Sequence, residues 1–256
     1  MARLRSWLRL ILIAKATVLF FSMWMLGRPF LIARPSLRRR WRSFNLGTLT
    51  RTILRLMNVR VEVVGSAPRP PFLLVSNHLS YFDIVVLSSL LDTIFVAKSE
   101  VRSWPVLGFL VRHLDTVFVD RNLGRDLPRV VARIEAALEA GEGVVIFPEG
   151  TSTSGASVAP FRPSLLEPAA RGRLAVSAAA LSYSTSADQP LAHVSICWWG
   201  DMAFTDHFFR MLALPGFSVR VAFGEGTVCD SDRKRLAQRL HSRVLELFVP
   251  VSGAVS

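Results

Sequence analysis

The sequence predicts an α/β fold in which helices flank a mixed, largely buried sheet, preceded by a two-helix arm that anchors the chain to a membrane. From residue 59 onward, strand-like and helix-like segments alternate, which is typical of a sheet covered by helices. The first 60 residues hold 13 Arg and Lys and no acidic residue. We therefore divide the chain into a basic, apolar arm over residues 1–58 and an α/β domain over residues 59–256.

The positive charge of the chain belongs to the arm. The net charge is +12, but the 31 basic and 19 acidic residues of the whole chain leave the domain behind the arm close to neutral. A basic face spread over the domain would favour nucleic acid, whereas a basic, apolar arm favours an anionic membrane surface. We expect a membrane partner and no nucleic acid.

The arm has two candidate helices. Residues 16–26 form an uncharged run between Lys15 and Arg28, which covers only about 16 Å as a helix and is short for a bilayer. A second candidate covers residues 44–57, and the stretch 38–42 between them suits phosphate headgroups. We predict a monotopic anchor in one leaflet, with a single span as the alternative. A cleaved signal peptide fits poorly because Lys15 interrupts the apolar segment.

The elements of the domain follow from hydrophobic patterning and from turn residues. Asp126 followed by Pro128 marks a helix start, and Gly141 marks a helix end. The expected strands are 60–64, 72–76, 93–97, 116–119, 144–147, 174–183, 193–199 and 218–223. The expected helices are 81–91, 104–113, 127–140, 203–214 and 231–248.

A histidine and an acid follow the second strand. His78 and Asp83 lie five positions apart just past residues 72–76, and loops at strand ends commonly present reactive groups. Histidine is the side chain best suited to act as a base near neutral pH. Alternatively, Ser80 and Asp83 form a capping box at a helix start. The two interpretations are compatible, because a helix start that fixes Asp83 could aim its carboxylate at the imidazole.

Two further strand ends carry polar groups. Glu149 and Gly150 follow the strand 144–147, where the carboxylate could bind hydroxyls and the glycine could let backbone approach a ligand. Arg121 follows the strand 116–119 and suits a phosphate. The alternatives are a plain turn and a surface ion pair. The chain has no G-x-S-x-G elbow, P-loop or G-x-G-x-x-G, which argues against the enzymes that use them.

Cysteine and histidine spacings indicate neither disulfides nor a metal. Cys197 and Cys229 form no C-x-x-C pair, and we expect both to be inert core thiols in a reducing compartment. The remaining histidines show no metal-ligand spacing.

Together and in this order, the three strand-end segments resemble the glycerolipid acyltransferases, specifically the 1-acylglycerol-3-phosphate O-acyltransferase family. The family's N-H-x-x-x-x-D motif matches Asn77, His78 and Asp83, its apolar stretch ending in Arg matches Arg121, and its F-P-E-G-T motif matches residues 147–151. The resemblance covers roughly residues 60–225, and the arm resembles the two-helix membrane anchor of the family.

The resemblance implies transfer of a fatty acyl chain from acyl-CoA or acyl-ACP to the free hydroxyl of a lysolipid. The most direct acceptor is 1-acyl-sn-glycerol-3-phosphate, which would give phosphatidate in phospholipid biosynthesis. His78 would be the base and Asp83 would orient it. The acceptor would be bound by Asn77, Lys98, Arg121, Glu149, Gly150, Thr151 and Ser152. Neither a metal nor another cofactor is implied.

One residue departs from the family pattern. Many members carry an arginine after F-P-E-G-T, where this chain has Ser152. A phosphate would then rely on Arg121, Lys98, Arg162 or backbone amides near Gly150. Alternatively, the acceptor is a lyso-ornithine lipid or another lysolipid. A non-enzymatic membrane or nucleic-acid binder would explain the arm but not the three motifs.

The charge of the arm also predicts its location. Positive residues across 34–42 predict the cytoplasmic face of a membrane, expected to be the bacterial inner membrane. Acyl-CoA and acyl-ACP are found on that side.

Overall fold

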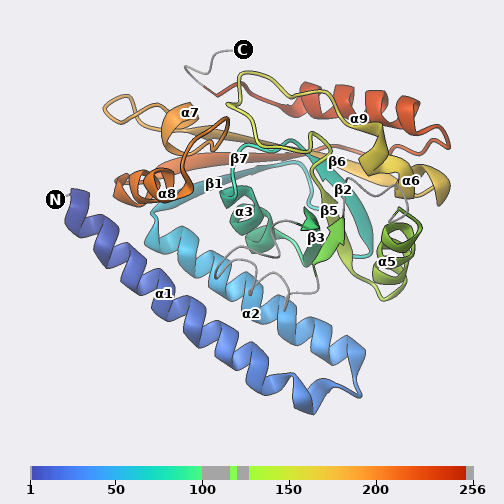
Figure 1. The fold of residues 1–256 in the computed structure, drawn as a ribbon, viewed down its shortest axis with the longest axis horizontal. Coiled ribbons are helices and arrows are strands. Elements are labelled where there is room, and N and C mark those ends of the chain that lie inside the picture. The colour runs from blue at the N-terminus through green and yellow to red at the C-terminus, as the bar shows by residue number, and fades with distance from the viewer. Residues whose placement is uncertain (1, 100–115, 120–126, 252–256) are drawn as a thin grey trace.

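The computed structural model describes residues 2–99, 116–119 and 127–251, and consists of a helical hairpin joined to a sheet with helices on both faces (Figure 1). The described strands form one seven-stranded sheet in the order β1-β7-β6-β2-β5-β3-β4. They are β1 (Val59–Val64), β2 (Phe72–Ser76), β3 (Thr93–Lys98), β4 (Val117–Val119), β5 (Gly143–Ile146), β6 (Val176–Ser184) and β7 (Phe217–Phe223). The sheet is mixed, as predicted, because β6 and β7 pair antiparallel while the other neighbours pair parallel.

The described helices cover both faces of the sheet. They are α1 (Ala2–Gly27), α2 (Pro35–Leu56), α3 (Phe82–Leu90), α5 (Leu127–Glu139), α6 (Glu167–Arg171), α7 (Ala192–Ser195), α8 (Phe204–Ala213) and α9 (Arg233–Leu247), with 3-10 turns at Pro29–Leu31 and Pro163–Leu166. Helices α2, α3 and α8 contribute to one apolar cluster, and α5, α6 and α9 contribute to another. In Figure 1, α9 and α2 accordingly lie on opposite sides of the sheet.

Strand β2 shows why the sheet is buried. Phe72 and Leu74 belong to the first cluster, whereas Leu73 and Val75 belong to the second. Successive side chains of a strand point to opposite faces, so an apolar residue at every position requires cover on both sides. All five residues of β2 are buried, as the continuous apolar run predicts.

The arm differs from its prediction in two respects. Helix α1 has 26 residues and includes Lys15, and within the described part of the chain it is the one helix long and apolar enough to cross a membrane. Helix α2 begins at Pro35, earlier than expected, so it contains the basic stretch 38–42. Arg39 and Arg42 lie one turn apart and face the domain, where they bind the Gly141 carbonyl and the Glu142 carboxylate. These two arginines are therefore not available to lipid headgroups.

A buried arginine fastens α1 to the domain. Arg9 donates to the carbonyl oxygens of Leu212 and Pro215 at 3.1 Å each, and also to that of Leu214. These carbonyls lie at the C-terminal end of α8, where a helix leaves its last acceptors unpaired and favours a cation. The Trp7 ring packs on Phe209 of the same helix at 5.3 Å between centroids.

Most expected elements of the domain are confirmed with shifts of one or a few residues at their ends. The expected strand 193–199 is wrong, since its start lies in the short helix α7 and the rest is a loop. A short apolar run does not distinguish a strand from other buried backbone. The turn and helix over 163–171 were not expected, and the expected helix 104–113 lies outside the described residues.

Candidate functional site

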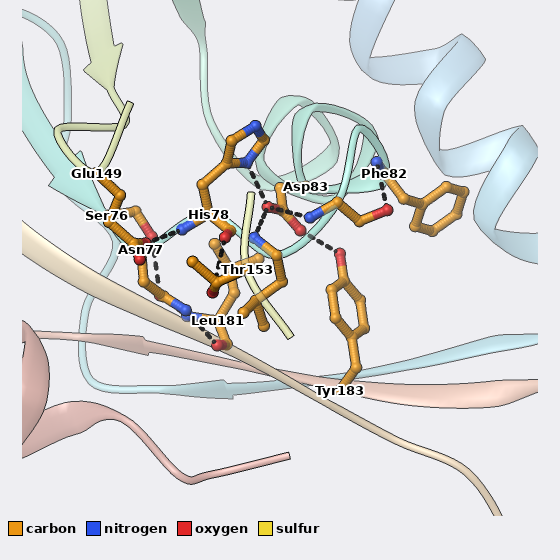
Figure 2. A network of polar contacts seen from close by, with 11 residues as sticks. Ser76, Asn77, His78, Phe82, Asp83, Glu149, Thr153, Leu181 and Tyr183 are labelled. Carbon is orange, nitrogen blue, oxygen red and sulfur yellow. Dashed lines mark hydrogen bonds and ion pairs between the residues drawn. The ribbon is translucent and has the colours of Figure 1, made fainter. Parts of the chain in front are cut away.

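The site lies where the parallel strands β2 and β5 end. These strands are neighbours in the sheet, so the segments that follow them emerge at the same edge. His78 follows β2 and Glu149 follows β5, and Figure 2 shows the two residues side by side. The sequence placed each residue at a strand end, and the structure shows that the two strands are neighbours.

The imidazole of His78 is paired with a buried carboxylate. Its Nδ1 atom lies 2.7 Å from Oδ2 of Asp83, and the side chains of His78 and Asp83 are 21% and 0% exposed. An ionised carboxylate only accepts hydrogen bonds, so Nδ1 carries the proton and Nε2 is left as the basic atom of a neutral ring. In Figure 2, the second ring nitrogen points away from Asp83.

Asp83 is held by four donors. Besides His78, its Oδ2 atom accepts from the backbone N–H groups of Leu79 at 2.7 Å and Ser80 at 3.0 Å. Its Oδ1 atom accepts from the Tyr183 hydroxyl at 2.7 Å. The first helical residue is Phe82, and its N–H donates to Ser80 Oγ at 3.3 Å. Asp83 therefore reaches back to the Ser80 N–H, which is one half of the predicted capping box, and it also orients the histidine. The other half is absent, because the Asp83 N–H donates to the Ser80 carbonyl at 3.0 Å and not to its hydroxyl.

Glu149 fixes the backbone of the loop that carries His78. Its Oε1 atom accepts the His78 N–H at 2.5 Å, and Oε2 accepts the Ala159 N–H at 2.8 Å. Thr153 donates its own N–H to the His78 carbonyl at 3.0 Å, so both backbone groups of His78 are held. Burial of Glu149 outweighs its two backbone donors and raises the pKa of the carboxyl to about 8. With both oxygens engaged, this carboxyl group supports the site from within.

The face of the imidazole lies on an aromatic ring. His78 stacks on Phe147 with 4.2 Å between centroids and 18° between planes, and Phe147 in turn stacks on Phe95. The stacking limits rotation of the imidazole and places its face on the π-surface of Phe147.

Asn77 has a structural position that the family resemblance did not imply. Its amide accepts the Leu181 N–H at 2.7 Å and donates to the Leu181 carbonyl at 2.9 Å. The side chain thus continues the pairing of β2 with β6 past the end of the strand, and it is 1% exposed. This geometry favours a role in holding the strand ends over direct contact with substrate.

The remaining predicted site residues differ in burial and in their hydrogen bonds. Gly150 is buried with φ +80°, a conformation that glycine adopts freely, and its N–H closes the turn onto the Phe147 carbonyl at 3.1 Å. Thr151 is exposed and Ser152 is half-buried. Arg162 is exposed and donates through Nε to the Glu149 carbonyl at 3.2 Å. Arg121 and the side chain of Lys98 lie outside the described part of the chain.

Sequence reasoning missed Tyr183, which binds Asp83 from β6. Its one sequence signal is a hydroxyl-bearing aromatic residue at the end of an apolar strand, because a buried tyrosine hydroxyl needs a partner. Also missed was the pair formed by the Tyr81 hydroxyl and His207 Nδ1, 3.0 Å apart. Burial lowers the pKa of His207 to about 4, so this histidine is neutral at pH 7.

The two cysteines differ. Cys197 is buried, and burial followed by the charge of Asp83 raises the pKa of its thiol, which is therefore inert. The expectation of two core thiols is wrong for Cys229, which is exposed. Across residues 2–99, 116–119 and 127–251, no three His, Cys, Asp or Glu side chains form a cluster that could hold a metal.

Comparison with known proteins identifies related sequences and a related fold. A family model described as Acyltransferase matches residues 58–182. A lyso-ornithine lipid O-acyltransferase of Brucella abortus is 33% identical over 233 residues, 86% of this chain and 87% of the relative. A second one, from Rhizobium meliloti, is 36% identical over 206 residues, 75% of this chain and 70% of the relative. A 1-acyl-sn-glycerol-3-phosphate acyltransferase of Neisseria meningitidis is 32% identical over 186 residues, 72% of this chain and 70% of the relative.

The fold is that of a solved enzyme. The crystal structure of the 1-acyl-sn-glycerophosphate acyltransferase PlsC from Thermotoga maritima matches with a TM-score of 0.68 at 21% identity. The match covers 96% of this chain and 98% of that chain. The predicted α/β fold with a mixed, helix-flanked sheet is thereby confirmed.

Proposed function

The chain belongs to the acyltransferase family that includes the lyso-ornithine lipid and 1-acyl-sn-glycerol-3-phosphate O-acyltransferases, and from this premise we propose how it moves a fatty acyl chain onto a lysolipid. The observation that carries the proposal is the 2.7 Å contact between His78 Nδ1 and the buried Asp83 carboxylate. It leaves a basic Nε2 on a partly exposed ring at the end of β2.

The reaction needs a base because an alcohol is a poor nucleophile at neutral pH. Nε2 of His78 removes the proton from the acceptor hydroxyl as its oxygen attacks the thioester carbonyl. A C–O bond forms, the tetrahedral intermediate collapses, and the C–S bond breaks. The imidazolium returns the proton to the departing thiolate, so the products are an acylated lipid and a free thiol.

Asp83 and Phe147 assist this proton transfer. The carboxylate stabilises the imidazolium and fixes the tautomer, and the Phe147 ring supports the same charge from the face of the imidazole. Backbone N–H groups near the turn at Gly150 are the proposed donors to the oxyanion of the intermediate.

For the acceptor we propose 1-acyl-sn-glycerol-3-phosphate first. Arg121, Lys98 and Arg162 are the cations proposed to bind its phosphate, and acyl-CoA or acyl-ACP is the proposed donor. Lyso-ornithine lipid is the second candidate. It is favoured by Ser152, which replaces the arginine that follows F-P-E-G-T in many members, and by the names of the Brucella and Rhizobium relatives.

We propose that the arm holds the enzyme on the cytoplasmic face of the membrane as a monotopic anchor. The tip of the hairpin exposes Leu26, Phe30 and Ile32, which are 71%, 85% and 68% accessible, and Arg34 beside them is exposed. Arg9 fastens the first turns of α1 to the end of α8. The start of the hairpin therefore lies against the domain, and lipid cannot surround both the start and the tip. Both the acceptor and the product are lipids, and an anchored enzyme meets them by lateral diffusion.

The test is acyl transfer by the purified protein in detergent micelles with one acyl-CoA and three acceptors, assayed in parallel. The acceptors are lysophosphatidate, lyso-ornithine lipid and lysophosphatidylcholine, and the acylated product is quantified by mass spectrometry. Preference for lysophosphatidate supports the first acceptor, and preference for lyso-ornithine lipid supports the second. Transfer to none of the three, with acyl-CoA or with acyl-ACP, contradicts the proposal.

A further inference from the structure

The hydroxyl of Tyr183 contacts the carboxylate of Asp83 on the oxygen that does not face His78. Tyr183 lies near the end of β6, is 2% exposed, and donates to Oδ1 at 2.7 Å. The other oxygen, Oδ2, lies against His78 Nδ1. A chain of hydrogen bonds therefore runs from Tyr183 through Asp83 to the imidazole, as Figure 2 shows.

We propose that Tyr183 is a positioning residue of acyl transfer, whose hydroxyl holds Oδ1 of Asp83 and sets how strongly that carboxylate supports the charge on His78. This inference rests on the proposed role of His78 as the base.

Orientation alone does not account for the hydroxyl. Oδ2 already accepts from His78, Leu79 and Ser80, so three donors fix the carboxylate without Tyr183. What a fourth donor adds is electrostatic, because a hydrogen bond to a carboxylate draws negative charge toward the donor. With the Tyr183 hydroxyl in place, Asp83 has less charge to offer the imidazolium and stabilises that cation less than it would without the hydroxyl.

The hydroxyl remains a donor across the working pH range. Burial, followed by the charge of Asp83, raises the pKa of Tyr183 well above its usual value, so the phenol stays protonated. The phenol of Tyr81 and the thiol of Cys197, whose pKa values burial raises, also stay protonated, and His207 stays neutral. Burial also raises the pKa of Glu149 to about 8, within this range, and Glu149 is the same in every variant compared below.

The chain provides a matched control for removal of the hydroxyl. It has two tyrosines, Tyr81 and Tyr183. Both are aromatic residues close to the site, but the Tyr81 hydroxyl pairs with His207 on α8 and makes no hydrogen bond to Asp83. Tyr81→Phe therefore removes the same atom without touching the carboxylate.

The experiment measures kcat/KM for acyl transfer against pH in wild type, Tyr183→Phe and Tyr81→Phe. Loss of the Tyr183 hydroxyl leaves more charge on Asp83, so the acid limb of the profile moves to higher pH by about 0.5–1 unit. The KM of the acceptor is expected to stay within about twofold, because Tyr183 is buried and bonds the Asp83 oxygen that does not face His78. Tyr81→Phe leaves the acid limb in place.

A second experiment keeps the tyrosine hydroxyl and is expected to shift the acid limb of the pH profile to lower pH. In the Tyr81→Phe background, Tyr183 is the one tyrosine left, so biosynthetic incorporation of 3-fluorotyrosine labels that position alone. The fluorinated phenol is more acidic and a stronger donor, so it withdraws more charge from Asp83 and shifts the acid limb to lower pH. If Tyr183→Phe fails to fold, the fluorotyrosine-labelled protein tests the role of the Tyr183 hydroxyl in its place.

Two outcomes overturn the inference. One is a Tyr183→Phe enzyme that is less heat-stable but keeps the wild-type acid limb, and the other is a fluorotyrosine enzyme whose limb does not move. His78→Ala, assayed alongside, separates this failure from failure of the proposed function. If His78→Ala is inactive while the limbs stay fixed, only the Tyr183 inference falls. If His78→Ala stays active, the proposed function falls as well.

Discussion

Glu149 accepts the backbone N–H of His78 through Oε1 at 2.5 Å, while its other oxygen accepts the N–H of Ala159. One buried carboxyl group thus joins the loop after β2 to the loop after β5. The contact is made to the backbone of His78 and not to its imidazole, so Glu149 positions the ring through the backbone. The F-P-E-G-T motif and the N-H-x-x-x-x-D motif are therefore parts of one structure.

Glu149→Gln is expected to lower both stability and activity. A Gln side chain keeps one acceptor oxygen but turns an NH2 group toward a backbone N–H, which leaves a buried donor without a partner at a cost of about 1–3 kcal/mol. We expect kcat to fall at least tenfold with a lower Tm, measured by acyl-transfer kinetics and by thermal unfolding in detergent. Wild-type Tm and kcat in Glu149→Gln would contradict this role.

The same residue gives a pH dependence of stability. Burial raises the pKa of Glu149 to about 8 in the folded protein, above its unfolded value. The folded state therefore holds a proton that the unfolded chain releases, and this contribution to stability is complete below about pH 4.5 and lost as pH rises through 8. Between pH 5 and 8, Tm should fall more steeply in wild type than in Glu149→Gln. Parallel Tm curves would show that Glu149 does not titrate in this range.

Asp83→Asn should abolish most of the activity at a moderate cost in stability. The Asn amide accepts fewer of the donors that meet at Asp83, and it cannot offset the charge on His78, so we expect kcat to fall by about 10²-fold or more. Asp232→Asn is the matched control, because Asp232 caps α9 by accepting the Lys234 and Arg235 N–H groups. If Asp83→Asn and Asp232→Asn both keep wild-type activity and differ from wild type only in Tm, capping is the main role of Asp83.

Arg9→Ala should detach the start of α1 from the domain. It leaves the carbonyls of Leu212 and Pro215 without their charged donor, which we expect to lower Tm by roughly 5 °C. Arg3→Ala on the exposed side of the same helix is the control and should leave Tm unchanged. Tm is measured by thermal unfolding in the same detergent. Equal Tm values for the two variants would show that the Arg9 contact does not hold α1 to the domain.

The hairpin tip should determine membrane binding. Introducing charge by Phe30→Asp with Ile32→Asp removes two exposed apolar side chains from the proposed lipid contact, and we expect vesicle affinity to fall about tenfold or more. Leu191→Asp, at a 48% exposed apolar position of the domain, is the control. Flotation with vesicles containing anionic lipid gives the comparison, and an equal loss in both variants would contradict insertion of the tip.

The sequence predicted the strand ends that carry the site residues, but not which strands are neighbours in the sheet. His78, Asp83 and Glu149 follow apolar runs, which mark the strand ends from patterning. Their proximity depends on the parallel pairing of β2 with β5, which the structure shows. Asp83 was recognisable because a capping acid lies a fixed three residues from Ser80.

Contacts between distant segments were not predictable in the same way. Tyr183 is 100 residues from Asp83, and the Tyr81 hydroxyl finds His207 across 126 residues. No periodicity encodes such pairs, because they depend on how β6 and α8 pack. The same holds for Arg42, whose place in a basic stretch suggests lipid contact but whose side chain forms an ion pair with Glu142, 100 residues away.

The most direct test of the central claim is acyl transfer by His78→Ala in purified, folded enzyme. Removing a general base should lower kcat by about 10²–10⁴-fold, with a Tm close to wild type because the imidazole is partly exposed and the loop is held through its backbone. A loss of less than about tenfold, in protein shown to be folded by thermal unfolding, would contradict the assignment of His78 as the base.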